Sequence, residues 1–120
     1  RLIVGDNYPR AIAAMQLYSV LLVNPIKDGM NLVAKEGALV NQNNGVLILS
    51  EQTGAFDELG EEALAVSPFD IYGTAQAIHR ALMMPLEERQ SRAENLHQIV
   101  VNADVKSWFN NQVADALESF

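Results

Sequence analysis

Residues 27–36 read KDGMNLVAKE, from Lys27 to Glu36, and they separate two apolar stretches. Upstream, residues 20–23 read VLLV and are followed by an Asn-Pro pair. Such a run is typical of a strand that is buried on both faces and stops at the proline. Downstream, residues 30–40 are apolar almost all round, which predicts a buried helix. The segment therefore predicts a strand exit, a tight turn and a helix start.

The turn at Gly29 is the candidate ligand site. Glycine lets a ligand approach the backbone without a side chain in the way. The first amides of the helix, near Asn31, Leu32 and Val33, have no partner inside the helix and point outward. Together with the positive end of the helix dipole, they favour an anion such as a phosphate.

Two carboxylates flank this anion site, Asp28 in the turn and Glu36 more than one turn inside the helix. Carboxylates accept hydrogen bonds from hydroxyl groups and do not bind phosphate. A nucleotide sugar, with phosphate in the middle and hydroxyl-rich groups at both ends, would use all three features. The same residues also suit an ordinary helix start in which Asp28 caps free N–H groups. The residues alone leave both interpretations open.

A second apolar run, at residues 46–49, follows a polar loop. Strand, helix and strand in that order predict a parallel pair with a right-handed crossover. Ligands of such sheets bind beyond the carboxyl ends of the strands, where the turn at Asp28 and the loop 50–54 should meet. Glu51 in that loop is interpreted as a loop-capping carboxylate without a catalytic role.

The rest of the chain predicts short strands and helices in alternation. We expect strands at 2–4 and 63–66, helices at 9–18 and 55–59, and further helices beginning near residues 71, 86 and 105. Asp70 should cap the first of these three, whose apolar face is expected to comprise Ile71, Ala75, Ile78 and Leu82. The next helix should pack through one stripe, Ala93, Leu96 and Val100.

Composition and charge exclude several classes of protein. The chain has 120 residues, 49% of them hydrophobic, which supports one domain with a real core. It has no apolar run of ~20 residues and no signal-peptide pattern, so we expect no membrane segment. The absence of cysteine fits a cytoplasmic protein. A formal net charge of −7 argues against nucleic acid as a partner. His79 and His97 lack further ligands at metal-binding spacing.

Residues 22–36, 45–51 and 65–70 resemble the trehalose-6-phosphate synthase family, and the resemblance extends through 77–89 to Trp108. Members are retaining glycosyltransferases with two Rossmann-like domains and an active site in the cleft between them. The resemblance implies an α/β fold, a three-layer Rossmann-like parallel sheet. Residues 1–120 would form part of the UDP-glucose-binding donor domain, including extra C-terminal helices at 86–120.

The same resemblance implies a role for each residue of the turn. Donor contacts are expected from Asp28, Gly29, Met30, Asn31, Leu32, Val33 and Glu36. Asp28 and the backbone that follows it would hold the glucose of UDP-glucose, the amides of Leu32 and Val33 would meet the diphosphate, and Glu36 would take the ribose hydroxyls. Asp28 is the residue expected to act in catalysis, by orienting the sugar. The resemblance implies no metal and no cofactor beyond the donor substrate.

Since Arg1 stands where an initiator methionine would, and residues 1–5 suggest the interior of a strand, we interpret the chain as a fragment. The acceptor-binding N-terminal domain would be missing, so we expect no transferase activity from these residues alone. In relatives the last helix crosses to that domain. We therefore expect part of its apolar stripe, which includes Trp108 and Phe109, to be exposed or buried in a homo-oligomer contact.

Two alternatives remain open from the sequence. One is a glucosylglycerol-phosphate or pseudo-sugar synthase of the same family, since such relatives share this donor motif. The other is a binding or regulatory module that keeps the fold without the chemistry.

Overall fold

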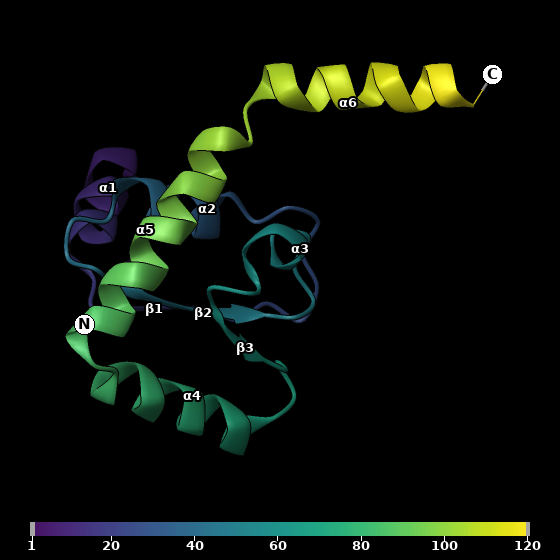
Figure 1. Cartoon of the computed structure of the whole chain (residues 1–120). Helices are drawn as coiled ribbons and strands as arrows, with labels where there is room; N and C mark the ends of the chain where they lie inside the picture. The colour runs from purple at the N-terminus through teal and green to yellow at the C-terminus, as the bar shows by residue number, and fades with distance from the viewer. Residues whose placement is uncertain (1, 120) are drawn as a thin grey trace.

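The central sheet contains three parallel strands in the order β1 (Val20–Val23), β2 (Val46–Ser50) and β3 (Leu64–Val66) (Figure 1). Val23 pairs with Leu49, and Ser50 pairs with Val66. The computed structural model describes residues 2–119. The predicted strands at 20–23 and 46–49 and their parallel pairing are confirmed.

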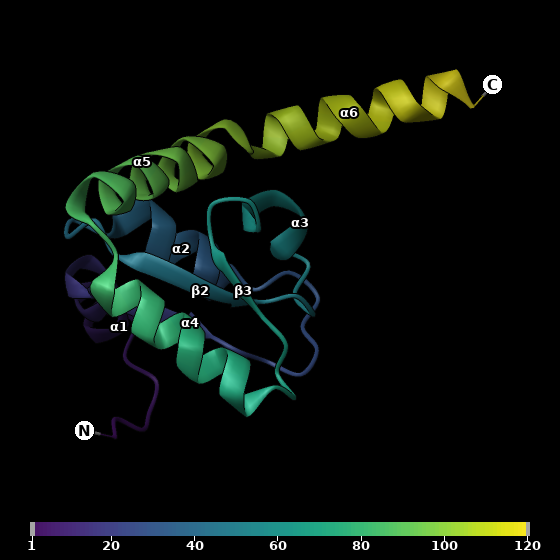
Figure 2. The ribbon, with the colours of Figure 1, turned by 60° about the horizontal axis from the view of Figure 1, so that its bottom comes forward.

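Helices cover both faces of this sheet. On one face lie α2 (Leu32–Val40) and α5 (Leu86–Asn102), and on the other lies α4 (Ile71–Met83) (Figure 2). Two shorter helices complete this body: α1 (Tyr8–Leu17) packs beside α2, and α3 (Phe56–Leu59) packs against α5. The expected three-layer Rossmann-like arrangement is therefore confirmed.

The middle strand explains why its sequence is apolar without interruption. Leu47 and Leu49 of β2 belong to the hydrophobic cluster under α2 and α5, whereas Val46 and Ile48 belong to the cluster under α4. All four side chains are at most 2% exposed. Since side chains alternate across a strand, a strand covered by helices on both faces needs apolar residues at every position.

The strand before the 27–36 segment is less buried than its sequence predicts. In β1 only Val23 is buried, and Leu22 is 42% exposed. Among residues 2–119, β1 pairs with β2 alone and so lies at the edge of the sheet. The predicted strand at 2–4 is wrong, because residues 2–4 pair with no strand and Leu2 is 89% exposed.

The prediction that α2 is buried all round is also wrong. Its buried residues are Ala34, Gly37 and Ala38, whereas the larger Leu32 and Val33 are exposed. Small residues allow the helix to approach the sheet closely, so they form the packed face. An apolar residue is buried only where another element packs on it, and on the opposite face Leu32 and Val33 remain 59% and 44% exposed.

The helix at 71–83 shows a similar difference. As predicted, Asp70 caps α4, and its side chain accepts a hydrogen bond of 2.8 Å from the Gly73 amide. The packed face contains Ile78 together with Ala77 and Ala81. Ile71 and Leu82 are exposed, so the predicted apolar face was placed partly on the wrong side of the helix.

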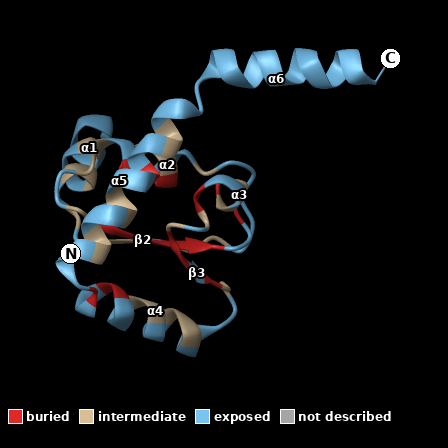
Figure 3. Cartoon of the chain, in the orientation of Figure 1, coloured by how far each residue is buried: buried red, intermediate tan, exposed pale blue. Residues whose placement is uncertain are grey.

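The two C-terminal helices behave differently from each other. As predicted, α5 packs through Leu96, with Val100 partly buried beside it. The last helix, α6 (Val105–Glu118), projects away from the body and contains no buried residue (Figures 1 and 3). Trp108 is 63% exposed, which confirms the expected exposure of the α6 stripe.

Candidate functional site

Two loops meet at the carboxyl edge of the sheet, one after β1 and one after β2. The Asp28 amide donates a hydrogen bond to the Gln52 carbonyl at 3.2 Å, and the Gly54 amide donates to the Asp28 carbonyl at 3.3 Å. Asp28 and Thr53 form an isolated parallel bridge. The predicted proximity of the Asp28 turn and the loop 50–54 is therefore confirmed.

The Ser50 side chain connects these two loops through hydrogen bonds. It is fully buried at the end of β2. Its hydroxyl donates to the Pro25 carbonyl at 2.9 Å and accepts from the Gln52 amide at 3.1 Å. A buried hydroxyl that satisfies two backbone groups fixes both loops at once. Sequence reasoning assigned Ser50 no role, although a serine ending a strand of four buried apolar residues is a usable signal.

Gly54 is the glycine that the contact between the loops requires. A Cβ at Gly54 would clash with the Gly29 carbonyl oxygen. Just beyond it, the Ala55 amide donates to the Met30 carbonyl at 2.9 Å. Gly29 itself faces open space, since a Cβ there would have no heavy atom within 4 Å. The space beside Gly29 is thus open, while Gly54 sets the position of the backbone there.

The start of α2 is organised by Asn31 and not by Asp28. Asn31 precedes the first helical residue, and its Oδ1 accepts a hydrogen bond of 2.9 Å from the Ala34 amide. Its Nδ2 donates to Oδ2 of Asp28 at 3.0 Å. The interpretation of Asp28 as the helix cap is therefore wrong, because a cap must lie directly before the helix, which begins at Leu32.

The free amides of α2 lie next to this cap. The Ala34 amide donates to Asn31, whereas the amides of Leu32 and Val33 have no partner among residues 2–119. The side chains of both residues are exposed. Together with the positive end of the helix dipole, these two amides can donate hydrogen bonds to an anion that binds from solvent.

Glu36 lies further along the same helix. Its spacing of three and four residues from Val33 and Leu32 places it on their face of α2, away from the buried face. Its neighbour Lys35 forms an ion pair of 2.7 Å with Glu58 of α3 and so faces that helix. The seven residues predicted from sequence thus occupy the turn before α2, its first turn and, for the partly buried Glu36, the side of the helix away from its buried face.

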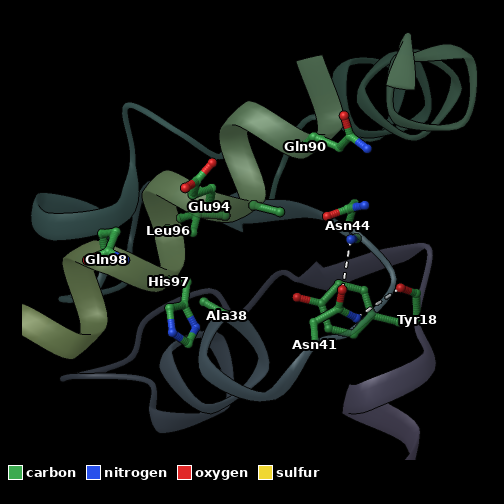
Figure 4. A pocket seen from close by; sticks show the side chains of 11 residues that line it. Tyr18, Ala38, Asn41, Asn44, Gln90, Glu94, Leu96, His97 and Gln98 are labelled. Carbon is green, nitrogen blue, oxygen red and sulfur yellow. Dashed lines mark hydrogen bonds between the residues drawn. The ribbon is translucent and has the colours of Figure 1, made fainter. Parts of the chain in front are cut away.

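A separate cavity lies at the opposite end of the strands, near the start of β2. It measures about 520 Å³ and is formed by α5 residues such as His97 and by Tyr18, Asn41 and Gly45, the last of which precedes β2 (Figure 4). Asn41 donates to the Tyr18 carbonyl at 3.0 Å and accepts from the Gly45 amide at 2.8 Å. Burial raises the pKa of Tyr18 to about 12. None of the predicted site residues lines this cavity.

A smaller cavity adjoins the candidate site. It has a volume of about 350 Å³ and lies between the start of α2 and the start of α6, where Met30 and Leu32 face Val105 and Trp108. Its walls are mainly apolar, so it suits packing better than recognition of a phosphate or a sugar.

Two further properties of residues 2–119 bear on function. No group of three or more His, Asp or Glu side chains is placed to hold a metal ion. None of the helices formed by residues 2–119 has the length and apolar character needed to cross a membrane.

Comparison with known sequences identifies clear relatives. The model of "Glycosyltransferase family 20" matches residues 6–118. A trehalose-6-phosphate synthase from Sinorhizobium fredii is 44% identical over 113 residues, which are 92% of this chain and 24% of that protein. One from Citrobacter koseri is 45% identical over 96 residues, 78% of this chain and 20% of that protein. The chain therefore spans a quarter or less of the length of these curated relatives.

Solved structures share the fold. A UDP-forming α,α-trehalose-phosphate synthase from Burkholderia xenovorans, in complex with glucose 6-phosphate, superimposes with a TM-score of 0.83 and 40% identity over 92% of this chain and 25% of its own. An E. coli structure bound with UDP-2-fluoro glucose gives a TM-score of 0.84 and 37% identity, and covers 95% of this chain and 26% of its own.

Proposed function

Because this chain belongs to glycosyltransferase family 20, we propose that it forms the donor-binding part of a trehalose-6-phosphate synthase. The parent reaction transfers glucose from UDP-glucose to glucose 6-phosphate with retention of configuration. The observation that carries the proposal is the turn before α2, where the Asp28 carboxylate stands beside the free amides of Leu32 and Val33. An acid for sugar hydroxyls and a cradle for phosphate thus lie side by side.

The diphosphate of the donor would bind at the amides of Leu32 and Val33. The chain carries a formal net charge of −7, so its overall field opposes an anion. Local backbone dipoles at a helix N-terminus act at short range and can overcome this field. As the bond between the glucose and the diphosphate breaks, the same amides would stabilise the charge that develops on the leaving group.

The two ends of the donor would bind to the two carboxylates. Asp28 would accept hydrogen bonds from glucose hydroxyls, together with the open backbone of Gly29, Met30 and Asn31, and so orient the sugar for transfer. Glu36, which is partly buried on the side of α2 away from its packed face, would accept hydrogen bonds from the ribose. No metal ion or cofactor enters this scheme. The Asp28 carboxylate orients the glucose and is not assigned a nucleophilic role.

The acceptor glucose 6-phosphate would bind mainly outside residues 2–119. The solved relatives are about four times longer than this chain, and we propose that an N-terminal domain of the parent protein supplies the acceptor site in the cytoplasm. The isolated 120-residue chain is then expected to bind UDP-glucose weakly and to form no trehalose 6-phosphate.

The decisive experiment is a calorimetric titration of the chain with UDP-glucose. Asp28→Ala and Glu36→Ala should each weaken binding by about tenfold, as expected for loss of hydrogen bonds to a charged group. Glu87→Ala, which removes an exposed carboxylate from the first turn of α5, serves as the control and should bind like the unchanged chain.

Equal binding by all four proteins would remove the assignment of Asp28 and Glu36 while leaving donor binding in place. Failure of the unchanged chain to bind UDP-glucose at millimolar concentration would contradict the donor-binding role itself. A transferase assay of the isolated chain adds an independent check, because product formation would contradict the proposed location of the acceptor site.

A further inference from the structure

The Asn31 side chain joins the two parts of the proposed donor site. One end of its side-chain amide, Oδ1, accepts a hydrogen bond of 2.9 Å from the backbone N–H of Ala34. The other end, Nδ2, donates to Oδ2 of Asp28 at 3.0 Å. A single planar group therefore connects the start of α2 to the acid that precedes it.

We propose that Asn31 is a positioning residue, whose side chain fixes the Asp28 carboxylate in the orientation that the donor sugar requires. This inference rests on the proposed function and adds to it a role for a side chain. The backbone of Asn31 was expected to contact glucose, whereas its side chain acts through Asp28 without reaching the ligand.

The backbone at this position supports such a role. Among residues 2–119, only Asn31 and Asn44 combine a side chain with positive φ, and φ of Asn31 is 68°. Left-handed backbone is costly for most L-residues and is best tolerated by asparagine and aspartate. Strain of this kind persists where the surrounding contacts hold it, and it gathers at functional sites. In Asn31 the strained backbone allows both ends of the amide to be used.

The residue type is as informative as the geometry. Aspartate would cap Ala34 equally well but would place a second carboxylate against Asp28. Serine would cap the helix with its single oxygen and has no second polar atom that could also reach Asp28. Of the good capping residues, asparagine alone carries its acceptor for the helix and its donor for the acid on two separate atoms, Oδ1 and Nδ2.

The contact also decides which groups remain for the ligand. Oδ2 of Asp28 already accepts one hydrogen bond from Asn31, so Oδ1 is the more open oxygen for a sugar hydroxyl. The Ala34 amide is likewise occupied, so the diphosphate is directed to Leu32 and Val33. One side chain thereby sets the separation between the sugar contact and the phosphate contact.

The test compares two probes, UDP and UDP-glucose, with the 120-residue chain and two variants. Asn31→Gly keeps the backbone conformation and loses the whole side chain. Asn31→Ser keeps an oxygen for the cap and loses the separate Nδ2 donor that reaches Asp28. We expect both variants to lose about tenfold in affinity for UDP-glucose and little for UDP, which has no glucose. Asp70→Gly, which removes the cap of α4, is the matched control and should change neither affinity.

A parallel fall for both probes, or recovery by Asn31→Ser, would show a role in capping the helix and would overturn the inference. If both variants bind UDP-glucose with the affinity of the unchanged chain, the inference is overturned too, while the proposed function stays intact. Failure of the unchanged chain to bind UDP-glucose would remove both.

A measurement without ligand tests the contact directly. The side-chain amide resonance of Asn31 should shift in an Asp28→Ala variant and stay in place in an Asp57→Ala variant, in which an exposed carboxylate of α3 is removed. An Asn31 resonance that does not respond to Asp28→Ala would contradict the contact whatever the chain binds.

Discussion

Gly54 packs directly against the carbonyl oxygen of Gly29, in a space that leaves no room for a Cβ on Gly54. This contact holds the loop after β2 against the turn that carries Asp28. The two glycines are 25 residues apart in sequence, yet each has a distinct and separable role, since Gly29 faces open space and Gly54 does not.

Replacing Gly54 should therefore affect mainly stability, whereas replacing Gly29 should affect mainly ligand binding. Gly54→Ala forces the two loops apart and should lower the free energy of unfolding by roughly 1–3 kcal/mol, the usual cost of overpacking. Gly29→Ala should leave stability nearly unchanged, because its Cβ meets no heavy atom within 4 Å, but should weaken UDP-glucose binding by filling the open space. Urea denaturation and ligand titration of both variants measure the two effects. Equal destabilisation by both substitutions would contradict this assignment.

Ser50→Ala should destabilise the same loops. The substitution removes the shared partner of the Pro25 carbonyl and the Gln52 amide at a partly buried position, which costs on the order of 1–3 kcal/mol. Denaturant unfolding measures the loss, and UDP-glucose affinity should fall with it because the Asp28 turn loses support. Ser91→Ala, at an exposed position of α5, is the control. A Ser50→Ala protein as stable as the control would show that the hydroxyl does not fasten the loops.

Stability should fall in alkaline solution through Tyr18. Burial raises the pKa of this phenol from 10.0 to about 12, so the folded chain retains the proton that the unfolded chain releases. The contribution of neutral Tyr18 is complete below pH 10.0 and is lost as the pH rises to about 12. Denaturation midpoints across this interval should decline more steeply for the unchanged chain than for Tyr18→Phe, which keeps the ring and cannot titrate. Identical slopes would contradict the burial of the hydroxyl.

The exposed stripe of α6 should mediate self-association at high concentration. Trp108 and Phe109 are 63% and 59% exposed, and an apolar stripe of this kind favours contact with a second copy. Since Trp108 is the single tryptophan, its emission should shift to shorter wavelength as the chain is concentrated. Phe109→Ser should abolish that shift, and the neighbouring Asn110→Ser should preserve it. Sedimentation that stays monomeric at all concentrations would contradict the prediction.

The sequence alone determined most of the elements, although not the strand expected at 2–4, and it singled out the segment proposed as the donor site. The apolar run at residues 20–23 and the one beginning at Val46 form strands because local hydrophobicity and bounding polar residues suffice to define them. The cap at Asp70 was likewise predictable, since it depends on residues three apart. The turn containing Asp28 lies in one continuous stretch, so its proximity to the helix start needed no tertiary information.

The tertiary structure alone decided which faces are covered and which contacts hold the site. Leu22, Leu32 and Ile71 are apolar but exposed, because burial depends on which other element packs there and not on the residue itself. Ser50 and Gly54 act on partners about 25 residues away in sequence, through hydrogen bonds and close contacts that no local pattern encodes. Asn31 became the link between Asp28 and α2 only once its left-handed backbone aimed both ends of one amide at different partners.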